Sequence, residues 1–172
     1  MINLLNNILI HDKVVIITNS DSHRYLTKLL TMIKNYLGQD NYIEHNKICN
    51  YYQDKYFEDF VAANKNKGKR IISTAINSWI SNSDKTWNIF NNAKFILPYR
   101  GISTFNGANL PMSSIPTKLS YSADLILHLY NSELTIIKMR NNTYMSENKI
   151  YLNDLLLEER HTKVNKIKQL IR

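Results

Sequence analysis

The chain has 172 residues, of which 44% are hydrophobic and 21% are charged, and this fits one globular domain with a buried core. Its net charge of +8 favours a polyanionic partner such as nucleic acid. No apolar run reaches the roughly 18 residues of a membrane span, and the first ten residues lack the basic region of a signal peptide. The single cysteine, Cys49, excludes an internal disulfide. We therefore expect a cytoplasmic protein in a reducing compartment, with a phage-infected host cell or an organelle matrix as alternatives.

Short apolar runs alternate with helical patterns along the chain. Residues 13–18 hold four consecutive apolar residues before a polar turn, a pattern typical of a strand buried on both faces of a parallel sheet. Residues 25–37 have helical spacing, with Gly38 as the expected C-cap. Further strands are expected at 41–44, 71–74, 94–97 (ended by Pro98), 123–129, 134–138 and 149–152, with a hairpin turn at 130–133. Further helices are expected at 52–63, at 76–90 with a break, and at 155–171.

Two connecting segments stand out between these elements. Residues 64–70 carry four cations and predict a basic loop. Residues 101–120 have no periodicity and contain two glycines and two prolines. A loop of that length inside a compact domain is usually functional.

The order of these elements resembles the RecA-like ATPase core of recombinases, DnaB-type helicases and KaiC-like proteins. The local match is the run Ser-Ala-Asp-Leu-Ile-Leu-His-Leu at 122–129, followed by Leu-Thr-Ile-Ile-Lys-Met-Arg at 134–140. The resemblance implies a three-layer α/β fold: a mostly parallel sheet flanked by helices, with a C-terminal strand meander and a terminal helix. It implies one RecA-like domain over 1–172, with 155–172 as a basic C-terminal helix.

The same resemblance implies two contact regions. Lys138 and Arg140 match a K-x-R strand end that reaches a nucleotide on a neighbouring subunit, and residues 101–120 match a loop that touches DNA. The alternative interpretation is that Lys138 and Arg140 are the solvated end of a strand. Because they alternate with Ile137 and Met139, we expect both cations on one face and both apolar residues on the other.

The nucleotide-binding motif of that family is missing. A P-loop needs glycines and a Gly-Lys-Ser/Thr end, yet residues 18–27 contain no glycine, and Asp21 places a negative charge there. Residues 71–74 contain no acidic residue for magnesium. The five histidines form no H-x-x-x-H or H-E-x-x-H pair. We therefore expect no enzyme activity, cofactor or metal, and we expect Ser20, Asp21 or Ser22 to cap the following helix.

Nucleic acid or a partner protein is expected to contact basic side chains and one aromatic side chain, since cations bind phosphates and rings stack on bases. The candidates are Lys65, Lys67, Lys69, Arg70, Arg100, Phe105, Lys118, Lys138, Arg140, Lys163, Lys166 and Lys168. The first hypothesis is a non-catalytic RecA-like protein that binds DNA or RNA and joins a replication or recombination machine, with a protein partner or a second copy and no membrane. The alternative is a structural RNA-binding subunit of a large ribonucleoprotein such as an organellar ribosome.

Overall fold

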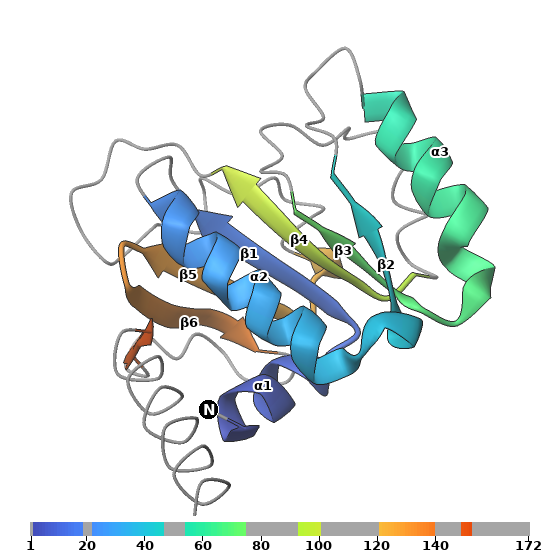
Figure 1. The fold of residues 1–172 in the computed structure, drawn as a ribbon. Coiled ribbons are helices and arrows are strands. Elements are labelled where there is room, and N and C mark those ends of the chain that lie inside the picture. Colours follow the sequence, from blue (N-terminus) through green and yellow to red (C-terminus); the bar gives the residue numbers. More distant parts are fainter. Residues whose placement is uncertain are drawn as a thin grey trace, which may run out of the picture.

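Seven strands form one sheet in the computed structural model of the chain, which describes residues 2–18, 22–46, 54–74, 93–100, 121–139 and 149–152 (Figure 1). The strands lie in the order β2-β3-β4-β1-β5-β6-β7. Their bounds are β1 Lys13–Thr18, β2 Tyr42–His45, β3 Arg70–Ser73, β4 Phe95–Arg100, β5 Leu125–Tyr130, β6 Glu133–Met139 and β7 Lys149–Tyr151. The first five strands pair in parallel, and β6 and β7 pair antiparallel. The predicted α/β fold with a mostly parallel sheet is therefore confirmed.

Helices cover both faces of this sheet, as predicted (Figure 1). Helices α1 (Ile2–Leu9) and α2 (His23–Leu37) pack on one face with Val14 and Ile16 of β1. Helix α3 (Asp54–Asn64) packs Val61 on the other face, where it meets the cluster that contains Val15 and Ile17. Because alternate residues of β1 enter two separate cores, all four must be apolar.

Short turns of 3-10 helix, η2 (Gln39–Asn41) and η3 (Lys65–Lys67), follow α2 and α3. Gly38 ends α2 with a φ of 80°, and its N–H donates to the carbonyl of Lys34, which confirms the predicted C-cap. The hairpin turn is also confirmed, with Asn131 in the left-handed region at a φ of 51°. No helix in the described part of the chain is long and apolar enough to cross a membrane.

Three local predictions are wrong. Strand β4 does not end at Pro98 but continues to Arg100 along β1. The β3 ladder stops at Ile96, so Pro98 lies where β4 has one neighbour in the described sheet and a missing N–H is tolerated. The capping prediction is wrong at Ser22, which occupies the N-cap position of α2 without a capping side-chain hydrogen bond, whereas Ser20 and Asp21 lie outside the described residues.

The third difference is a register shift between β5 and β6. Ile126 lies opposite Lys138, whereas Leu127 lies opposite Ile136, so Ile137 is an extra residue in β6. The expected alternation across Ile137 and Lys138 is therefore interrupted at this bulge. The helical stretch at 76–90, the loop at 101–120 and the terminal helix at 155–171 lie outside the described residues.

Candidate nucleic-acid interface

Lysines line the edge of the sheet where the parallel strands begin. Lys69 directly precedes β3, Lys94 directly precedes β4, and Lys13 is the first residue of β1. These three strands are neighbours, and Phe95 lies opposite both Ile71 and Lys13, so the three lysines fall within two register positions of one another. We call Lys13, Lys69 and Lys94 the lysine row. Strand β6 runs the opposite way and brings Lys138, opposite Ile126, toward the same edge.

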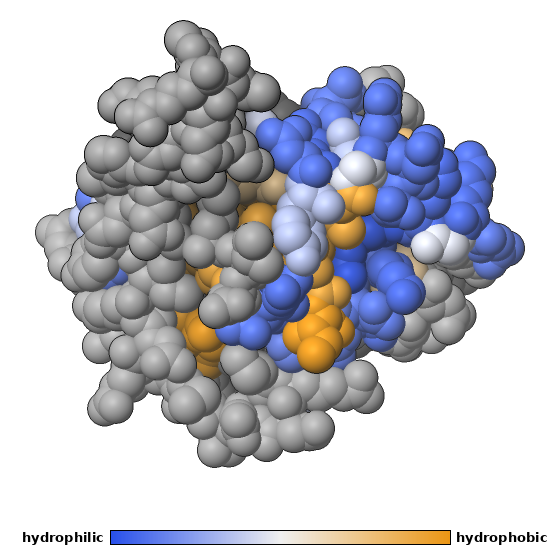
Figure 2. Space-filling model, turned by 60° about the horizontal axis from the view of Figure 1, so that its bottom comes forward, coloured by the Kyte–Doolittle hydropathy of each residue, from blue (hydrophilic) through white to orange (hydrophobic). Residues whose placement is uncertain are grey.

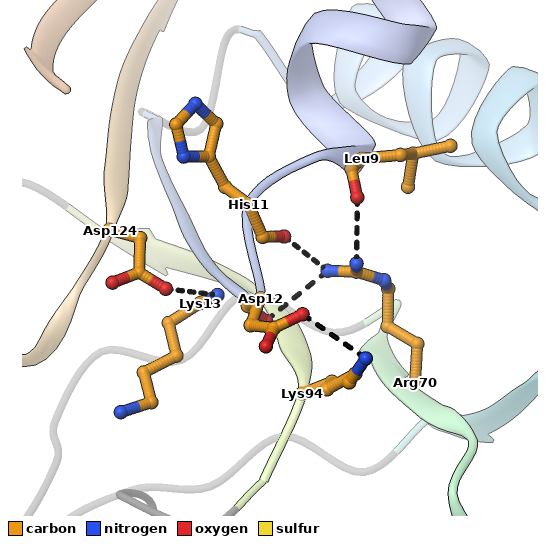
Figure 3. A network of polar contacts seen from close by, with 7 residues as sticks. All are labelled: Leu9, His11, Asp12, Lys13, Arg70, Lys94 and Asp124. Carbon is orange, nitrogen blue, oxygen red and sulfur yellow. Dashed lines mark hydrogen bonds and ion pairs between the residues drawn. The ribbon is translucent and has the colours of Figure 1, made fainter. Parts of the chain in front are cut away.

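A buried arginine holds this edge together (Figure 3). The Arg70 side chain extends from the start of β3, and the residue is only 7% exposed. Its guanidinium donates hydrogen bonds to the carbonyls of Leu9 at 3.1 Å, His11 at 2.8 Å and Asp12 at 3.2 Å. Leu9 ends α1, so Arg70 satisfies a helix-terminal carbonyl and fixes the turn between α1 and β1.

Two carboxylates lie among these cations, and both have partners. Asp12 forms an ion pair with the Lys94 ammonium at 3.3 Å. This ion pair is exposed and therefore contributes little to stability. Asp124, just before β5, accepts the backbone N–H of Lys13 at 3.1 Å, and its own N–H donates to the Lys13 carbonyl at 2.8 Å. Figure 3 shows the Lys13 ammonium pointing away from both carboxylates. The acids therefore order the backbone of this edge and leave Lys13 directed outward.

Burial lowers the pKa of two groups in this network. Desolvation lowers the pKa of His11; Asp124 opposes this shift and the Arg70 charge adds to it. Desolvation also lowers the pKa of Arg70, and Asp12 partly offsets that effect. An arginine remains charged despite such a shift, so Arg70 contributes a fixed buried positive charge to the edge.

The structure brings some predicted contact residues together and separates others. Lys67 is exposed in the connection from α3 to β3, and Lys69, a member of the lysine row, is half-buried in the same connection. The prediction that Arg70 belongs to this exposed basic loop is wrong, because its guanidinium is buried against three carbonyls. Arg100 ends β4 next to Thr18, at the opposite edge of the sheet.

For the remaining candidates the structure describes only the backbone or nothing at all. Lys65 lies in η3 and Lys138 in β6, but the side chains of Lys65, Arg100 and Lys138 are not among those described. The rest fall outside the described residues: Phe105, Lys118, Arg140, Lys163, Lys166 and Lys168.

Sequence reasoning missed Lys13 and Lys94. The sequence did contain a pattern that indicates them, because a lysine stands at or just before the start of three separate apolar strands. The three runs are Lys-Val-Val at 13–15, Lys-Arg-Ile at 69–71 and Lys-Phe-Ile at 94–96. In parallel neighbours such residues fall at the same edge.

The opposite, carboxyl edge is closed by a contact between two turns. The Ser22 hydroxyl accepts a hydrogen bond from the N–H of Asn131 at 2.8 Å, and Ser22 is fully buried. This contact links the start of α2 to the β5–β6 hairpin. Across the described residues, no group of three or more His, Cys, Asp or Glu side chains is placed to hold a metal ion.

No protein-family model and no curated protein matches this sequence. Two of the solved structures that resemble it are the following. The flagellar accessory protein FlaH from Methanocaldococcus jannaschii is 12% identical with a TM-score of 0.40, covering 79% of this chain and 83% of that chain. A Pyrococcus horikoshii OT3 protein studied as project PH0250 is 14% identical with a TM-score of 0.36, covering 78% and 92%. Scores this low identify no family, so the α/β class stated here depends on the strand order and registers.

Proposed function

We propose that the chain is a non-catalytic, RecA-like nucleic-acid-binding protein that joins a replication or recombination machine, and that it contacts phosphates with the lysine row. The observation that carries the proposal is the alignment of Lys13, Lys69 and Lys94 on three adjacent strands. Lys67 extends the row on one side, and β6, which carries Lys138, extends it on the other. The net charge of +8 points to the same class of partner.

The dimensions of the row suit a nucleic-acid backbone. Neighbouring strands lie about 4.8 Å apart, so the edge from β3 to β6 spans about 19 Å. A stacked single strand carries one phosphate per roughly 3.4 Å, so this edge would face about six phosphates. Binding would release counterions, and affinity would therefore fall as salt is raised.

The rigidity of the edge supports the same proposal. Arg70 and Asp124 fix the backbone on both sides of Lys13 through hydrogen bonds to and from main-chain atoms. A fixed backbone limits the entropy that the main chain of this edge must lose on binding. Binding would then require the ordering of side chains alone at these positions.

We also infer that the chain does not hydrolyse ATP. Residues 18–27 contain no glycine to wrap phosphates, and the Ser22 hydroxyl at the start of α2 is engaged by the N–H of Asn131. Isothermal titration with ATP and Mg²⁺ should give no heat of binding. Micromolar binding would contradict this part of the proposal.

The lysine row is tested by fluorescence anisotropy with a labelled 20-nucleotide single strand, as DNA and as RNA, over a range of salt. The double variant Lys13→Gln with Lys69→Gln should weaken binding at least tenfold, which is about 1.4 kcal/mol. It should also reduce the slope of log affinity against log salt by about 1.4, because two phosphate contacts are lost.

The matched control removes the same charge elsewhere. Arg24 and Lys28 lie on the first two turns of α2, at the carboxyl side of the sheet, and the first turn of α2 contains no acidic residue. The double variant Arg24→Gln with Lys28→Gln should change affinity less than twofold. Equal losses in both variants, or no salt-dependent binding by the parent chain, would overturn the proposal.

The second hypothesis, a structural subunit of a ribonucleoprotein such as an organellar ribosome, uses the same basic surface. A strong preference for RNA over DNA of the same sequence, with a ribosomal particle co-purifying, would favour it. Co-purification of a helicase or recombinase with DNA would favour the first hypothesis.

A further inference from the structure

Tyr121 is the most exposed large apolar or aromatic side chain in the described part of the chain, at 82%. It lies three residues before Asp124, in the short segment that leads into β5. Ala123, two residues further along, is only 2% exposed and belongs to the core cluster that α3 joins. The backbone beside Tyr121 is therefore anchored in the core, while the aromatic ring itself meets solvent.

This anchored position lies beside the lysine row. Strands β1 and β5 are parallel neighbours with Val14 opposite Leu125, so the residues before β5 lie next to the residues that begin β1. The Asp124 N–H donates to the Lys13 carbonyl at 2.8 Å, and the Lys13 N–H donates to the Asp124 carboxylate at 3.1 Å. Three residues of chain span at most about 11 Å, so Tyr121 lies within about three nucleotides of a stacked strand from this contact.

We propose that Tyr121 stacks on a base of a nucleic-acid strand whose phosphates lie on the lysine row, and that this contact favours single strands over duplexes. This role rests on the proposed function and specifies its substrate class. The planar ring can stack on either face of any base, so the contact needs no particular sequence. One such stack is worth about tenfold in affinity, or about 1.4 kcal/mol.

A duplex cannot use the same contact. Its bases are already paired and stacked on their neighbours, so one of them must leave the stack, at a cost in free energy, before it meets the ring. The phosphates of a duplex remain accessible to the lysine row. The ring and the cations therefore make separable contributions, because only the ring distinguishes an unpaired base from a paired one.

A protein partner fits this position less well. Protein interfaces have a core depleted of charge and bury roughly 800 Å² on each partner, whereas Tyr121 shares its edge of the sheet with Lys13, Lys69 and Lys94. Figure 2, in which the bottom of Figure 1 comes forward, shows described residues that are mostly hydrophilic with smaller hydrophobic areas among them. An aromatic ring among cations matches a ligand that offers both phosphates and bases.

Fluorescence anisotropy with three labelled ligands tests the role of the ring. The ligands are a 20-nucleotide single strand of DNA, the duplex of the same sequence, and a base-free strand of the same length that keeps the deoxyribose and the phosphates. Tyr121→Ala should weaken binding of the single strand at least fivefold, because a stack on a base is lost. The same variant should change the affinity for the duplex and for the base-free strand less than twofold.

Three further variants serve as controls. Tyr121→Phe keeps the ring and should stay within twofold of the parent chain on every ligand. Tyr121→Leu keeps apolar surface without a plane and should lose most of what Tyr121→Ala loses. Tyr25→Ala removes a half-buried ring at the start of α2, on the carboxyl side of the sheet, where the Lys28 ammonium lies 5.8 Å from the ring centroid. This matched loss of an aromatic ring beside a lysine should change the three affinities less than twofold.

The salt dependence separates this role from the lysine row. Tyr121→Ala removes no charge, so the slope of log affinity against log salt should equal that of the parent chain, whereas Lys13→Gln with Lys69→Gln lowers it by about 1.4. Full affinity of Tyr121→Ala for the single strand, or equal weakening on all three ligands, would overturn the role of the ring and leave the lysine row standing. Absence of salt-dependent binding by the parent chain would overturn the proposed function, and the role of the ring with it.

Discussion

Arg70 is a buried side chain that organises the edge of the sheet where the parallel strands begin, although its place in a basic run predicts exposure to solvent. Its guanidinium donates to three carbonyls from the turn that links α1 to β1. The guanidinium makes this possible because it donates from two terminal nitrogens in fixed directions, whereas an ammonium donates from a single nitrogen. The residue therefore acts on the lysine row indirectly, by fixing the backbone that precedes Lys13.

We predict that Arg70→Met lowers the free energy of unfolding by about 3 kcal/mol. The change removes three hydrogen bonds and leaves carbonyls that are partly buried, each costing on the order of 1–3 kcal/mol unless water reaches it. Arg70→Lys should lose nearly as much, because Lys replaces only part of the donor set. The control is Lys69→Met, next in the chain and half-exposed, which should stay within about 0.5 kcal/mol. Urea denaturation measures all three, and a stable Arg70→Met would show that the network is dispensable.

His11 predicts a pH dependence at the same edge. Its pKa is lowered in the folded chain, chiefly by desolvation, so protons bind the unfolded chain more readily. The stability contributed by neutral His11 is present above pH 6.5 and is lost as pH falls through the lower folded pKa. His11→Asn should therefore flatten the loss of stability below pH 6.5 relative to the parent chain. Thermal melts between pH 7 and pH 5 measure the difference, and parallel curves would contradict the prediction.

At the scale of elements, patterns within one strand or helix were sufficient for most of the fold. The run Val-Val-Ile-Ile at 14–17 predicts a strand buried on both faces, and all four residues are fully buried. Helix α2 follows from Leu26, Leu29 and Ile33, which are all buried at helical spacing. Helix α1 was missed because its eight residues are too short for a clear period.

The candidate interface was harder to predict because it is built across strands. Lys13, Lys69 and Lys94 become neighbours only when β3, β4 and β1 are placed side by side, and no local pattern gives that order. Arg70 was misplaced for a related reason. Its carbonyl partners are about 60 residues away in the chain, so a basic residue in a basic run gave no sign of burial.

The contact between α2 and the β5–β6 hairpin is testable at this scale. Ser22→Ala removes the acceptor for the Asn131 N–H and should cost about 1 kcal/mol. Hydrogen exchange at the Asn131 amide should then be faster by about tenfold, while amides inside α2 change less. Thr27→Ala is the control, because this exposed hydroxyl bonds the His23 carbonyl within the helix. Unchanged exchange at Asn131 would show that another group holds the hairpin.

At the scale of the whole molecule, the described core ends at Leu152. This residue is 2% exposed and joins the cluster under α1, and β7 just before it pairs with β6. The sequence after it contains five cations and several apolar residues at helical spacing. Truncation at two points of the chain can therefore separate the contribution of these residues from that of the described core.

We predict that ending the chain at Glu158 leaves cooperative unfolding intact, with the midpoint lowered by only a few degrees, because every buried core residue of the described part of the chain is retained. Single-strand binding should weaken severalfold, since five cations at 160–172 are removed. Ending the chain at Asn148 also removes β7 and Leu152, and the loss of one buried leucine alone should cost about 2–5 kcal/mol. Calorimetry of both truncations beside the full chain measures the difference. If the Glu158 truncation unfolds without cooperativity, the last 14 residues belong to the core, and the cations they carry stabilise the fold before they bind anything else.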